Sequence, residues 1–405
     1  MFYDKLGYIT LKKKEVEDLS KKQLNVGLVG YKFMGKAHSN AYRQAGMFFE
    51  LPVTVNMKTL CGREEAWVKD TAEKYGWEGY ATDWKNLAAD PDIDIVDICT
   101  PSNAHKEIAV EAAKAGKHIF CEKPLALSLA DAREMLAEAQ KTGVKHQIGF
   151  NYRFAPAVRL AKKMIDEGRL GRIFHYRGKY LQDFVMDPNF PLVWRLDKKV
   201  CGSGAHGDLG AHIIDLARFL VGDFKSVTGM SKTFIKQRPL AERMEGLTAS
   251  ASDTEMGEVH VDDATCFVAE FESGALATIE STRFAKGHKN DLSFEINGEK
   301  GSLRFELERM NELWYFNAED EEGFQGFRLI QASEGVHPYM HAWWPVGHVI
   351  GYEHTFVHEM VEFFNAIANN TPTSPDFGDG VRCSQILEAV DISIERRAWV
   401  DVASI

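Results

Sequence analysis

The fold is decided by the stretch Leu24-Asn25-Val26-Gly27-Leu28-Val29-Gly30-Tyr31-Lys32-Phe33-Met34-Gly35. Its apolar first half predicts a buried strand that enters a glycine turn, and residues 33–42 predict the helix that follows. Main-chain amides at the start of a helix attract phosphate. The stretch therefore indicates the opening of a dinucleotide-binding unit, whose candidate cofactor contacts are Gly30, Phe33, Met34 and Gly35.

The glycine pattern of this turn is incomplete. Gly30 and Gly35 occupy the first and third glycine positions of the dinucleotide-binding fingerprint, but Lys32 stands at the second. A glycine is usual there because a missing side chain lets the main chain approach the pyrophosphate. Either the loop bulges and Lys32 supplies a cation to the phosphates, or the site has changed its use. We favour the first interpretation and count Lys32 among the cofactor contacts.

The end of the second expected strand leaves the choice of cofactor open. Residues 53–61 predict a strand that ends at Gly62-Arg63, where many NAD-binding folds place an acid that binds the ribose hydroxyls. No acid stands at Gly62. Arg63 can neutralise a 2′-phosphate or lie over the adenine, while Glu64 and Glu65 can bind the ribose. The local chemistry therefore does not decide between NAD and NADP.

Strands and helices continue to alternate as far as residue 150, which predicts a parallel sheet with helices on both faces. The further expected elements are helices 64–75, 84–89, 105–115 and 128–142 and strands 93–99, 119–121 and 144–150. We expect residues 23–150 to form a Rossmann domain that follows a short N-terminal extension of residues 1–22.

One of these strands ends in the triplet Glu122-Lys123-Pro124. Proline removes the main-chain donor that would extend the strand, so Lys123 is expected at a strand's carboxyl end, the edge where open parallel sheets bind ligands. An amine at that edge can exchange a proton with a substrate hydroxyl. Alone, the triplet is more typical of a surface lysine at a turn, and the motifs on either side of it favour the catalytic interpretation. The preceding strand ends similarly, in the polar loop 100–105.

Composition changes after residue 150. Expected strands follow one another, joined by turns such as residues 272–274 and 297–301, and they cover residues 171–180, 264–271, 275–283, 291–297 and 302–306. Consecutive hairpins of this kind predict an open, largely antiparallel sheet. We therefore expect residues 151–405 to form an α+β domain, with helices 353–369 and 380–399 packed on or between the two domains.

A glycine-rich segment of the second domain leads into an amphipathic helix that carries Asp208 and His212, with Asp215 close to the same face. A carboxylate beside an imidazole can hold a polyhydroxylated ligand and relay a proton. Two other interpretations exist: a helix cap with a core histidine, and a metal site that adds Cys201 and His206. The second requires poor helical geometry for chelation, and we expect no metal.

Length and charge limit the class of protein. The 405 residues suit two domains, and the 45% apolar and 26% charged residues are typical of a soluble globular protein. No apolar run reaches the roughly 20 residues of a membrane span, and the charged N-terminal residues lack the core of a signal peptide. A net charge of −11 without a basic stripe argues against nucleic-acid binding. We expect a cytoplasmic protein with six free thiols.

Taken together, the motifs resemble those of the glucose-fructose oxidoreductase and inositol dehydrogenase (Gfo/Idh/MocA) family from about residue 24 to the C-terminus. The motifs are residues 30–35, 100–105, 122–124, 151–153, Trp194-Arg195 and Gly204-x3-Asp208-x3-His212. Within the family, residues 180–183, 187–189 and 337–339 resemble those of levoglucosan dehydrogenase and related bacterial glycoside 3-dehydrogenases.

The resemblance implies a catalytic group in which Lys123 exchanges the substrate's hydroxyl proton, His212 assists, and Asp208 binds and orients neighbouring hydroxyls. It places Tyr152 and Arg153 at the sugar site. It also implies that the nicotinamide and its ribose are bordered by Thr100, Asn103, His105, Glu122, Trp194 and Arg195. We expect NAD as cofactor, with NADP left open.

We therefore expect a dehydrogenase that moves hydride between a secondary hydroxyl, at C3, of a cyclic sugar, glycoside or polyol and the nicotinamide. Two alternatives remain: a redox-neutral glycosidase that uses tightly held NAD, and a cofactor-sensing regulator on a retired dehydrogenase scaffold. An open sheet leaves a large apolar face, so we also expect a homo-oligomer. The resemblance favours a tetramer.

Overall fold

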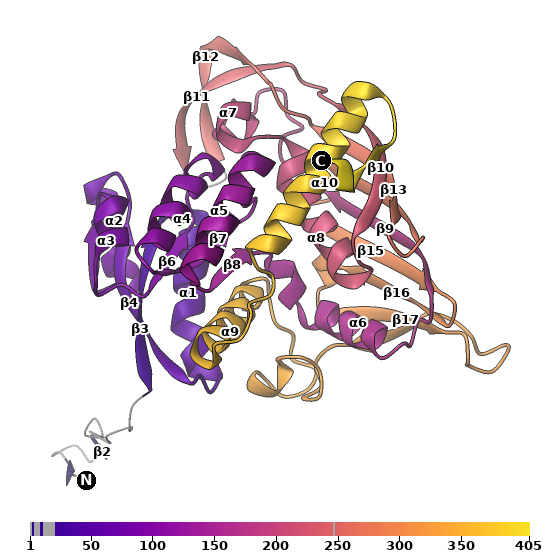
Figure 1. The fold of residues 1–405 in the computed structure, drawn as a ribbon, viewed down its shortest axis with the longest axis horizontal. Helices are drawn as coiled ribbons and strands as arrows, with labels where there is room; N and C mark the ends of the chain where they lie inside the picture. Colours follow the sequence, from indigo (N-terminus) through magenta and orange to yellow (C-terminus); the bar gives the residue numbers. More distant parts are fainter. Residues whose placement is uncertain (1, 4–8, 11–20, 246–247) are drawn as a thin grey trace.

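The computed structural model describes residues 2–3, 9–10, 21–245 and 248–405, and it contains two large sheets, each covered by helices (Figure 1). The N-terminal extension expected over residues 1–22 lies largely outside the described residues. No helix in the described ranges is long and apolar enough to cross a membrane.

The first sheet is the expected Rossmann sheet. Its six strands are parallel and lie in the order β5-β4-β3-β6-β7-β8. The strands are β3 (Lys22–Val29), β4 (Val53–Cys61), β5 (Gly79–Ala81), β6 (Ile95–Ile98), β7 (His118–Glu122) and β8 (His146–Gly149). The helices are α1 (Phe33–Phe48), α2 (Glu65–Tyr75), α3 (Trp84–Ala89), α4 (His105–Lys114) and α5 (Leu129–Thr142).

The strand order reverses between β3 and β6, which lie side by side with Val29 opposite Ile98. Such a switch point opens a crevice beyond the carboxyl ends of the strands, where ligands of α/β sheets bind. Gly30 follows β3 directly, Lys123 follows β7 directly, and Thr100 comes two residues after the end of β6. The topology therefore brings the predicted cofactor turn and the predicted catalytic lysine to one edge.

The second sheet has nine strands in the order β18-β17-β16-β15-β9-β14-β13-β10-β19. Its strands are β9 (Ile173–Leu181), β10 (Phe224–Lys232), β13 (Ala264–Phe271), β14 (Leu276–Thr282), β15 (Asp291–Gly298), β16 (Gly301–Glu306), β17 (Glu312–Asn317), β18 (Arg328–Gln331) and β19 (Val400–Asp401). A separate hairpin is formed by β11 (Gln237–Glu245) and β12 (Thr248–Glu258).

This sheet confirms the largely antiparallel α+β prediction but is larger than the sequence indicated. The strands β10, β17, β18 and β19 and the β11–β12 hairpin were not predicted. Polar and apolar residues mix without a clear period in β10 and β11, whereas β17 and β18 are short apolar runs between polar residues. The expected run of consecutive hairpins also fails at β9, which lies in the middle of the sheet and pairs in parallel with β14. Near the end of β9, the hydroxyl of Tyr180 lies 2.9 Å from that of Tyr152, just after the first domain.

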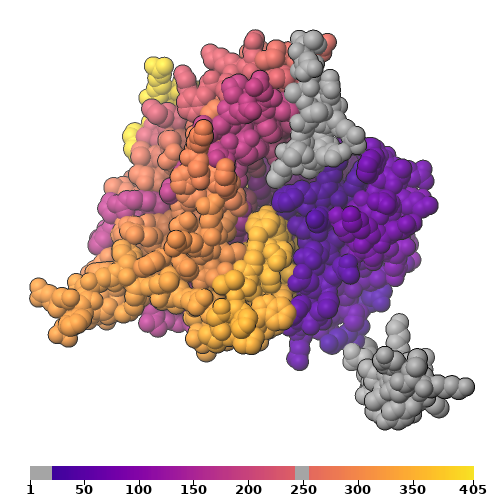
Figure 2. All heavy atoms as spheres, turned by 180° about the vertical axis from the view of Figure 1, so that it is seen from behind, coloured from indigo at the N-terminus to yellow at the C-terminus, as the bar shows by residue number. Residues whose placement is uncertain are grey.

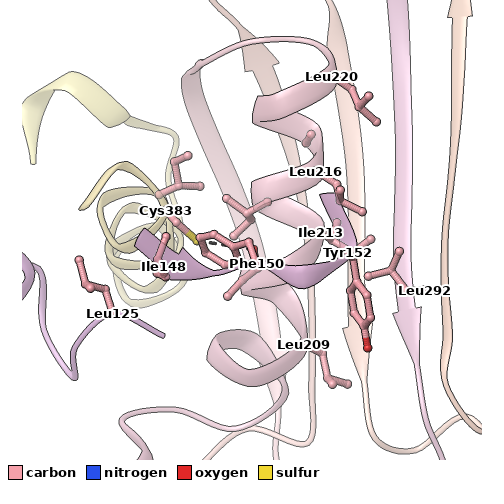
Figure 3. Packing of buried hydrophobic residues seen from close by; sticks show 14 of the residues in the cluster. Leu125, Ile148, Phe150, Tyr152, Leu209, Ile213, Leu216, Leu220, Leu292 and Cys383 are labelled. Atoms are coloured by element: carbon pink, nitrogen blue, oxygen red, sulfur yellow. Dashed lines mark hydrogen bonds between the residues drawn. The ribbon is translucent and has the colours of Figure 1, made fainter. Parts of the chain in front are cut away.

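Three helices cover one face of the second sheet: α6 (Pro156–Asp166), α8 (Ala211–Leu220) and α10 (Phe377–Arg396). Figure 3 shows Leu216 and Leu220 of α8 directed at the strands, with Phe150 and Tyr152 packed beside the same helix. Residues from both domains share this continuous apolar cluster. The helix that carries His212 is therefore fixed against the first domain as well as against its own sheet.

The helix α9 (Glu353–Asn369) returns to the first domain. Its Phe356 and Phe363 join the apolar cluster beneath α1 and β3, and Phe363 lies edge-on to Phe120 with ring centroids 5.6 Å apart. In the view from behind, the light-orange part of the chain lies between the indigo first domain and the orange sheet (Figure 2). α1, α2 and α9 thus cover one face of the Rossmann sheet, while α4 and α5 cover the other.

Candidate active site

Lys123 follows the last residue of β7 and reaches across to the second domain. Its Nζ donates hydrogen bonds to the main-chain oxygen and to Oδ1 of Asp208, both at 2.9 Å. The lysine side chain keeps 15% of its surface exposed, so the amine stays partly accessible at the cleft that a switch point opens beyond the carboxyl ends of the strands. The structure thus joins Lys123 and Asp208, two of the residues predicted to act together.

Asp208 is held from both sides. Its Oδ1 accepts from Lys123, and its Oδ2 accepts from Nη2 of Arg283 at 2.7 Å. Burial favours the protonated form of this carboxyl, but the charges of Lys123, Arg283 and Arg195 outweigh it and hold the pKa of Asp208 well below its usual range. Since each oxygen already has a protein donor, the carboxylate is well placed to orient Lys123. Arg283 was not predicted from the sequence.

The chain around Asp208 departs from the regular helix that the sequence predicted. Residues His206–Gly210 form a π-helical turn before α8 begins. Glycines make the turn possible, because a Cβ at Gly204 would lie 1.8 Å from the main-chain oxygen of Asp262 and one at Gly207 would lie 2.2 Å from Oγ of Ser203. Such π turns occur frequently at functional sites. Here the turn directs Asp208 toward β7.

His212 lies one turn further on and is buried. Its ring packs against that of Tyr152, with centroids 4.4 Å apart. Burial, and then the charge of Lys123, hold the pKa of His212 well below its usual value, so the imidazole is neutral at physiological pH. A neutral imidazole has one nitrogen free to accept a hydrogen bond. The charge of Lys123 acts on His212, so His212 lies near the Lys123–Asp208 pair, and its part in proton transfer stays a prediction.

A row of polar side chains continues from His212 across the second sheet. The hydroxyls of Tyr152 and Tyr180 lie 2.9 Å apart, and Tyr180 donates to Oδ1 of Asn290 at 2.7 Å. Gln182 donates to the same Oδ1 at 2.8 Å. Hydroxyl and amide groups at this spacing suit a polyhydroxylated ligand. Tyr152 was predicted, whereas Asn290 could be found only through the pairing of β15 with β9.

Arg153 does not join this group. Its Nε donates to Oδ2 of Asp215 at 2.7 Å, and its Nη1 reaches Asp379 of α10 at 3.4 Å. Nε, Nη1 and Nη2 of the guanidinium all donate to these carboxylates, so they are not offered to a sugar. The structure therefore corrects the expected sugar contact. Arg153 and Asp215 join α8 and α10 to the first domain, and Asp215 does not face the cleft.

The residues of the glycine turn fit a dinucleotide. Gly30 has φ of 105°, and a Cβ there would lie 2.6 Å from the main-chain oxygen of Cys99. A Cβ at Gly35 would lie 2.0 Å from the oxygen of Gly30, so α1 approaches the turn closely. No side chain caps the start of α1 at Lys32, which leaves the first amides available to phosphate. In the described chain, the buried Oγ1 of Thr100 has no hydrogen-bond partner, as expected of a group that serves a ligand.

Side chains on either side of the turn would border the cofactor. Phe33 and Lys32 are exposed and Met34 is half-buried at the start of α1, and Arg63 is exposed after β4. The absence of an acid at Gly62 has a packing reason, since a Cβ there would lie 2.2 Å from the ring of Tyr31. Arg63 and Lys32 are thus the cations near the adenosine end of the predicted site.

The remaining predicted contacts divide into exposed and buried groups. Asn103 is exposed, and Arg195 lies 4.4 Å over the ring of the half-buried Trp194. His105 is fully buried instead, and its ring nitrogens lie 2.9 Å from the main-chain oxygens of Thr100 and Pro124. His105 therefore connects the segments that follow β6 and β7. Glu122 is also buried and has partners of its own, which are described below.

The alternative metal site does not form. His206 Nε2 contacts the main-chain oxygen of Leu387 at 3.1 Å, and Sγ of Cys201 donates to the oxygen of Asp197 at 3.1 Å. Asp208 is paired with Lys123 and Arg283. These side chains therefore do not converge on a common point with His212.

Comparisons with known proteins agree with this geometry. Residues 24–150 match the description "Oxidoreductase family, NAD-binding Rossmann fold", and residues 158–304 match "GFO/IDH/MocA C-terminal domain". Levoglucosan dehydrogenase of Pseudarthrobacter phenanthrenivorans is 43% identical over 386 residues, which cover 94% of this chain and 99% of the relative. The scyllo-inositol 2-dehydrogenase (NAD(+)) of Bacillus subtilis is 34% identical over 246 residues, 60% of this chain and 63% of the relative.

Solved structures give the same result. An oxidoreductase domain protein from Kribbella flavida superposes with a TM-score of 0.89 at 46% identity, covering 94% of this chain and 99% of that one. Levoglucosan dehydrogenase in complex with NADH and levoglucosan superposes with a TM-score of 0.89 at 42% identity, covering 94% and 100%. The expected resemblance is confirmed: the chain belongs to the Gfo/Idh/MocA family of oxidoreductases, with an NAD-binding Rossmann domain at its N-terminus.

Proposed function

We propose that the protein is an NAD-dependent dehydrogenase that moves hydride between a secondary hydroxyl of a cyclic sugar, glycoside or polyol and the nicotinamide. The observation that carries the proposal is the amine of Lys123, held 2.9 Å from Asp208 Oδ1 and beside a neutral His212 at the carboxyl edge of the Rossmann sheet. The relatives named for levoglucosan and scyllo-inositol support a cyclic polyhydroxylated substrate.

The chain's own residues supply binding and proton transfer, while bound NAD supplies the hydride acceptor. The amine of Lys123, when unprotonated, takes the proton of the reacting hydroxyl, and as an ammonium it returns that proton in the reverse reaction. His212 is neutral, and its depressed pKa makes it a hydrogen-bond partner of the reacting hydroxyl or of Lys123 and a weaker base than the amine. Asp208 fixes the direction of the amine through two hydrogen bonds, to its carboxylate and to its main-chain oxygen. The row of Tyr152, Tyr180 and Asn290 would hold the other ring hydroxyls.

A screen of hydride transfer tests the proposal. The purified protein is mixed with NAD or NADP and a panel of free sugars, inositols and glycosides, and absorbance of reduced nicotinamide is followed. We expect reduction of NAD with at least one cyclic substrate. Release of aglycone without net change of the cofactor would instead indicate the redox-neutral glycosidase. A protein that binds neither NAD nor NADP would be neither the dehydrogenase nor the glycosidase.

The carbon that is oxidised can be found with the same assay. We propose C3, as the resemblance to glycoside 3-dehydrogenases implies. Substrates deuterated at one ring carbon at a time should transfer deuterium to the nicotinamide only when the label is at C3. Transfer from a different carbon would overturn this assignment and leave the dehydrogenase activity itself intact.

We further propose that the open face of the second sheet binds a second copy of the chain. That face has a hollow of about 1120 Å³ lined by apolar side chains and by charges of both signs. Met230 and Val268, which line it, are 71% and 41% exposed. Arg177 and Arg304 lie there with Glu280 and Glu295, a pattern that a two-fold interface can satisfy with itself.

Light scattering at micromolar concentration measures the mass. We expect a multiple of 45.6 kDa, with four copies favoured by the resemblance. Met230→Glu should lower the mass, whereas Lys114→Glu, on the exposed surface of α4 in the Rossmann domain, should not. A wild-type mass of one chain would refute the interface.

We also infer a cytoplasmic location. All six cysteines are free, and Cys61, Cys121 and Cys383 are buried, which suits a reducing compartment. Recovery of the native protein from the periplasmic or extracellular fraction of its host would contradict this inference.

A further inference from the structure

A buried cluster of charged side chains lies directly behind Lys123 and takes no part in the proton transfer proposed above. Its centre is His38 of α1, which is fully buried. His38 Nδ1 lies 2.8 Å from Oδ2 of Asp97, and its Nε2 lies 2.9 Å from Oε1 of Glu122. A neutral imidazole has one N–H to donate, whereas an imidazolium donates from both nitrogens. Two carboxylate partners therefore favour the charged ring.

Every element packed around His38 contributes a titratable group. The hydroxyl of Tyr42 in α1 donates to Oδ2 of Asp97 at 2.6 Å, and Sγ of Cys99, just after β6, lies 3.2 Å from His38 Nδ1. Burial, as the largest cause, raises the pKa values of Tyr42 and Cys99, and likewise those of Cys121 in β7 and Glu359 in α9. Tyr42, Cys99 and Cys121 are therefore uncharged at neutral pH, and burial shifts Glu359 toward its protonated form.

His38 responds in the opposite way. Burial opposes its charge, but the neighbouring Asp97 outweighs burial and raises the pKa of His38 well above its usual value. The rings of Phe120 and Phe356 flank it, with centroids 5.2 Å and 5.7 Å away, and leave little freedom to reorient. Within the described part of the chain, His38 is the cation that faces both Asp97 and Glu122.

A shared proton explains the distances better than a metal ion does. His38, Asp97 and Cys99 are of ligand types, and their ligand atoms lie within 4.8 Å of one another. However, the 2.8 Å between Nδ1 and Oδ2 is a hydrogen-bond distance. A tetrahedral zinc ion with bonds near 2.0 Å would hold such atoms about 3.3 Å apart.

The cluster is connected directly to the catalytic lysine. Oε2 of Glu122 accepts the main-chain N–H of Lys123 at 3.2 Å. The same carboxylate fills the space beside Gly149, where a Cβ would lie 2.9 Å from Oε1. Its position is thus fixed by His38 on one side and by the main chain on the other. His38 also lies on α1, whose first turn forms the predicted phosphate site.

We propose that His38 is a positioning residue of the dehydrogenase: as a buried imidazolium it bridges Asp97 and Glu122 and so fixes the main chain that presents Lys123 beside the cofactor helix. This inference rests on the proposed function, because positioning is expressed only through turnover. Loss of the bridge leaves Glu122 without its cation and the segment around Lys123 less well fixed, while the glycine turn predicted to bind the phosphates remains in place.

The test compares His38→Gln with the unmodified enzyme. We expect kcat to fall by about 10- to 10²-fold, the cost of misplacing a catalytic group by a fraction of an ångström to an ångström, while KM for NAD changes less than about threefold. The pH profile of kcat should also change relative to that of the unmodified enzyme, because the variant removes the cation from the charged cluster behind Lys123. A purely structural role would lower the melting temperature and leave the pH profile unchanged.

His358→Gln is the matched control, since His358 is equally buried but donates to the main-chain oxygen of Phe154 and accepts from Trp343 Nε1. It should lose stability and keep the wild-type pH profile. Ring-¹⁵N NMR of the unmodified protein needs no variant: one imidazolium signal should persist at pH 8.5, and its absence would overturn the proposal even if His38→Gln failed to fold.

Different results would reject the proposed dehydrogenase function and the positioning role of His38. A wild-type protein that transfers no hydride to NAD or NADP would reject the proposed function, and the positioning role with it. An active enzyme whose folded His38→Gln variant keeps the wild-type kcat and pH profile would overturn the role of His38 alone.

Discussion

Asp208 and Asp215 lie about two helical turns apart on one helical segment, and both pair with cations from elsewhere in the chain. Asp208 is 30% exposed and contacts Lys123 and Arg283 at the cleft. Asp215 is 2% exposed and accepts from Nε and Nη2 of Arg153. The same chemistry therefore serves two purposes. The partly exposed pair of Lys123 and Asp208 can contact a ligand, whereas the buried pair of Arg153 and Asp215 stabilises the packing of helices.

The enclosed pair belongs to a larger network. Asp379 of α10 accepts from Nη1 of Arg153 at 3.4 Å and from Nη1 of Arg218 at 3.2 Å, and Arg218 also contacts Asp223. The network joins the segment after β8, the helix α8 and the helix α10. It therefore fixes the helix that carries the catalytic pair, and removal of one partner should disturb stability before it disturbs chemistry.

The largest effect should come from the cleft, with Lys123→Met. This change removes the proton-exchanging amine and keeps most of the side-chain volume. We expect kcat to fall by about 10²- to 10⁴-fold, the usual contribution of a positioned acid or base, with the dissociation constant of NAD changed little. Steady-state kinetics and calorimetry measure the two quantities. Lys114→Met, in an exposed pair on α4, is the control. Near-native turnover of Lys123→Met would show that the base lies elsewhere.

The next largest effect should come from the enclosed pair. Asp215→Ala leaves the guanidinium of Arg153 buried with only the more distant Asp379, and breaking a buried pair in this way costs about 3–5 kcal/mol of unfolding free energy. Urea unfolding measures the loss. Asp223→Ala, which removes the exposed partner of Arg218, should cost less than about 0.5 kcal/mol. Equal costs for the two variants would mean that enclosure does not distinguish the pairs.

A smaller effect is expected for Arg283→Met, which removes one of the two cations that hold Asp208. Asp208 keeps its hydrogen bond from Lys123 but loses the hydrogen bond from Arg283 to Oδ2. We expect kcat/KM for the sugar to fall by about 10-fold, since one charge-assisted hydrogen bond contributes roughly 1.5–3 kcal/mol at most. KM for NAD should stay constant. If Asp208→Asn and Arg283→Met each reduce kcat/KM and the double variant is no worse than Asp208→Asn, the two residues act as one unit.

The comparison also shows what the sequence could predict. The position of Lys123 followed from local rules, since an apolar strand and a proline fix a strand end. The Asp208–His212 spacing predicted a regular helix face, but a π-helical turn carries Asp208 instead. Arg283 and Asn290 could not be predicted in this way, because the parallel pairing of β14 with β9 and the pairing of β15 with β9 bring them to the cleft.

Tyr152 and Arg153 illustrate the limit most directly. They are neighbours in sequence and were both assigned to the sugar site, yet they lie in a 3₁₀ turn, in which successive side chains diverge. Tyr152 faces His212, whereas Arg153 turns into the core toward Asp215. Residue type predicted that both would have important partners, but the turn decided which partners they have.

The two carboxylates should also differ in their response to pH, which is the smallest of these effects. Burial raises the pKa of Asp215 to about 6 in spite of Arg153. Its unfolded value is about 3.9, so the native state binds more protons than the unfolded state between about pH 4 and 6. The contribution of Asp215 to the unfolding free energy therefore falls as pH rises through that window. Asp208, whose pKa is depressed, contributes stability above about pH 4 and loses it only as pH falls further.

Urea unfolding at several pH values between 4 and 7 tests this difference. Asp215→Asn removes a contribution that falls with pH, so the slope of the unfolding free energy against pH should become more positive by up to about 1.4 kcal/mol per pH unit between 4 and 6. Asp208→Asn should leave the slope unchanged between about pH 5 and 6, because the carboxyl is ionised in both the native and the unfolded state there. A slope that changed equally in both variants would show that Asp215 is not the group that titrates near pH 6. The pH response of the two carboxylates would then not follow from their different burial.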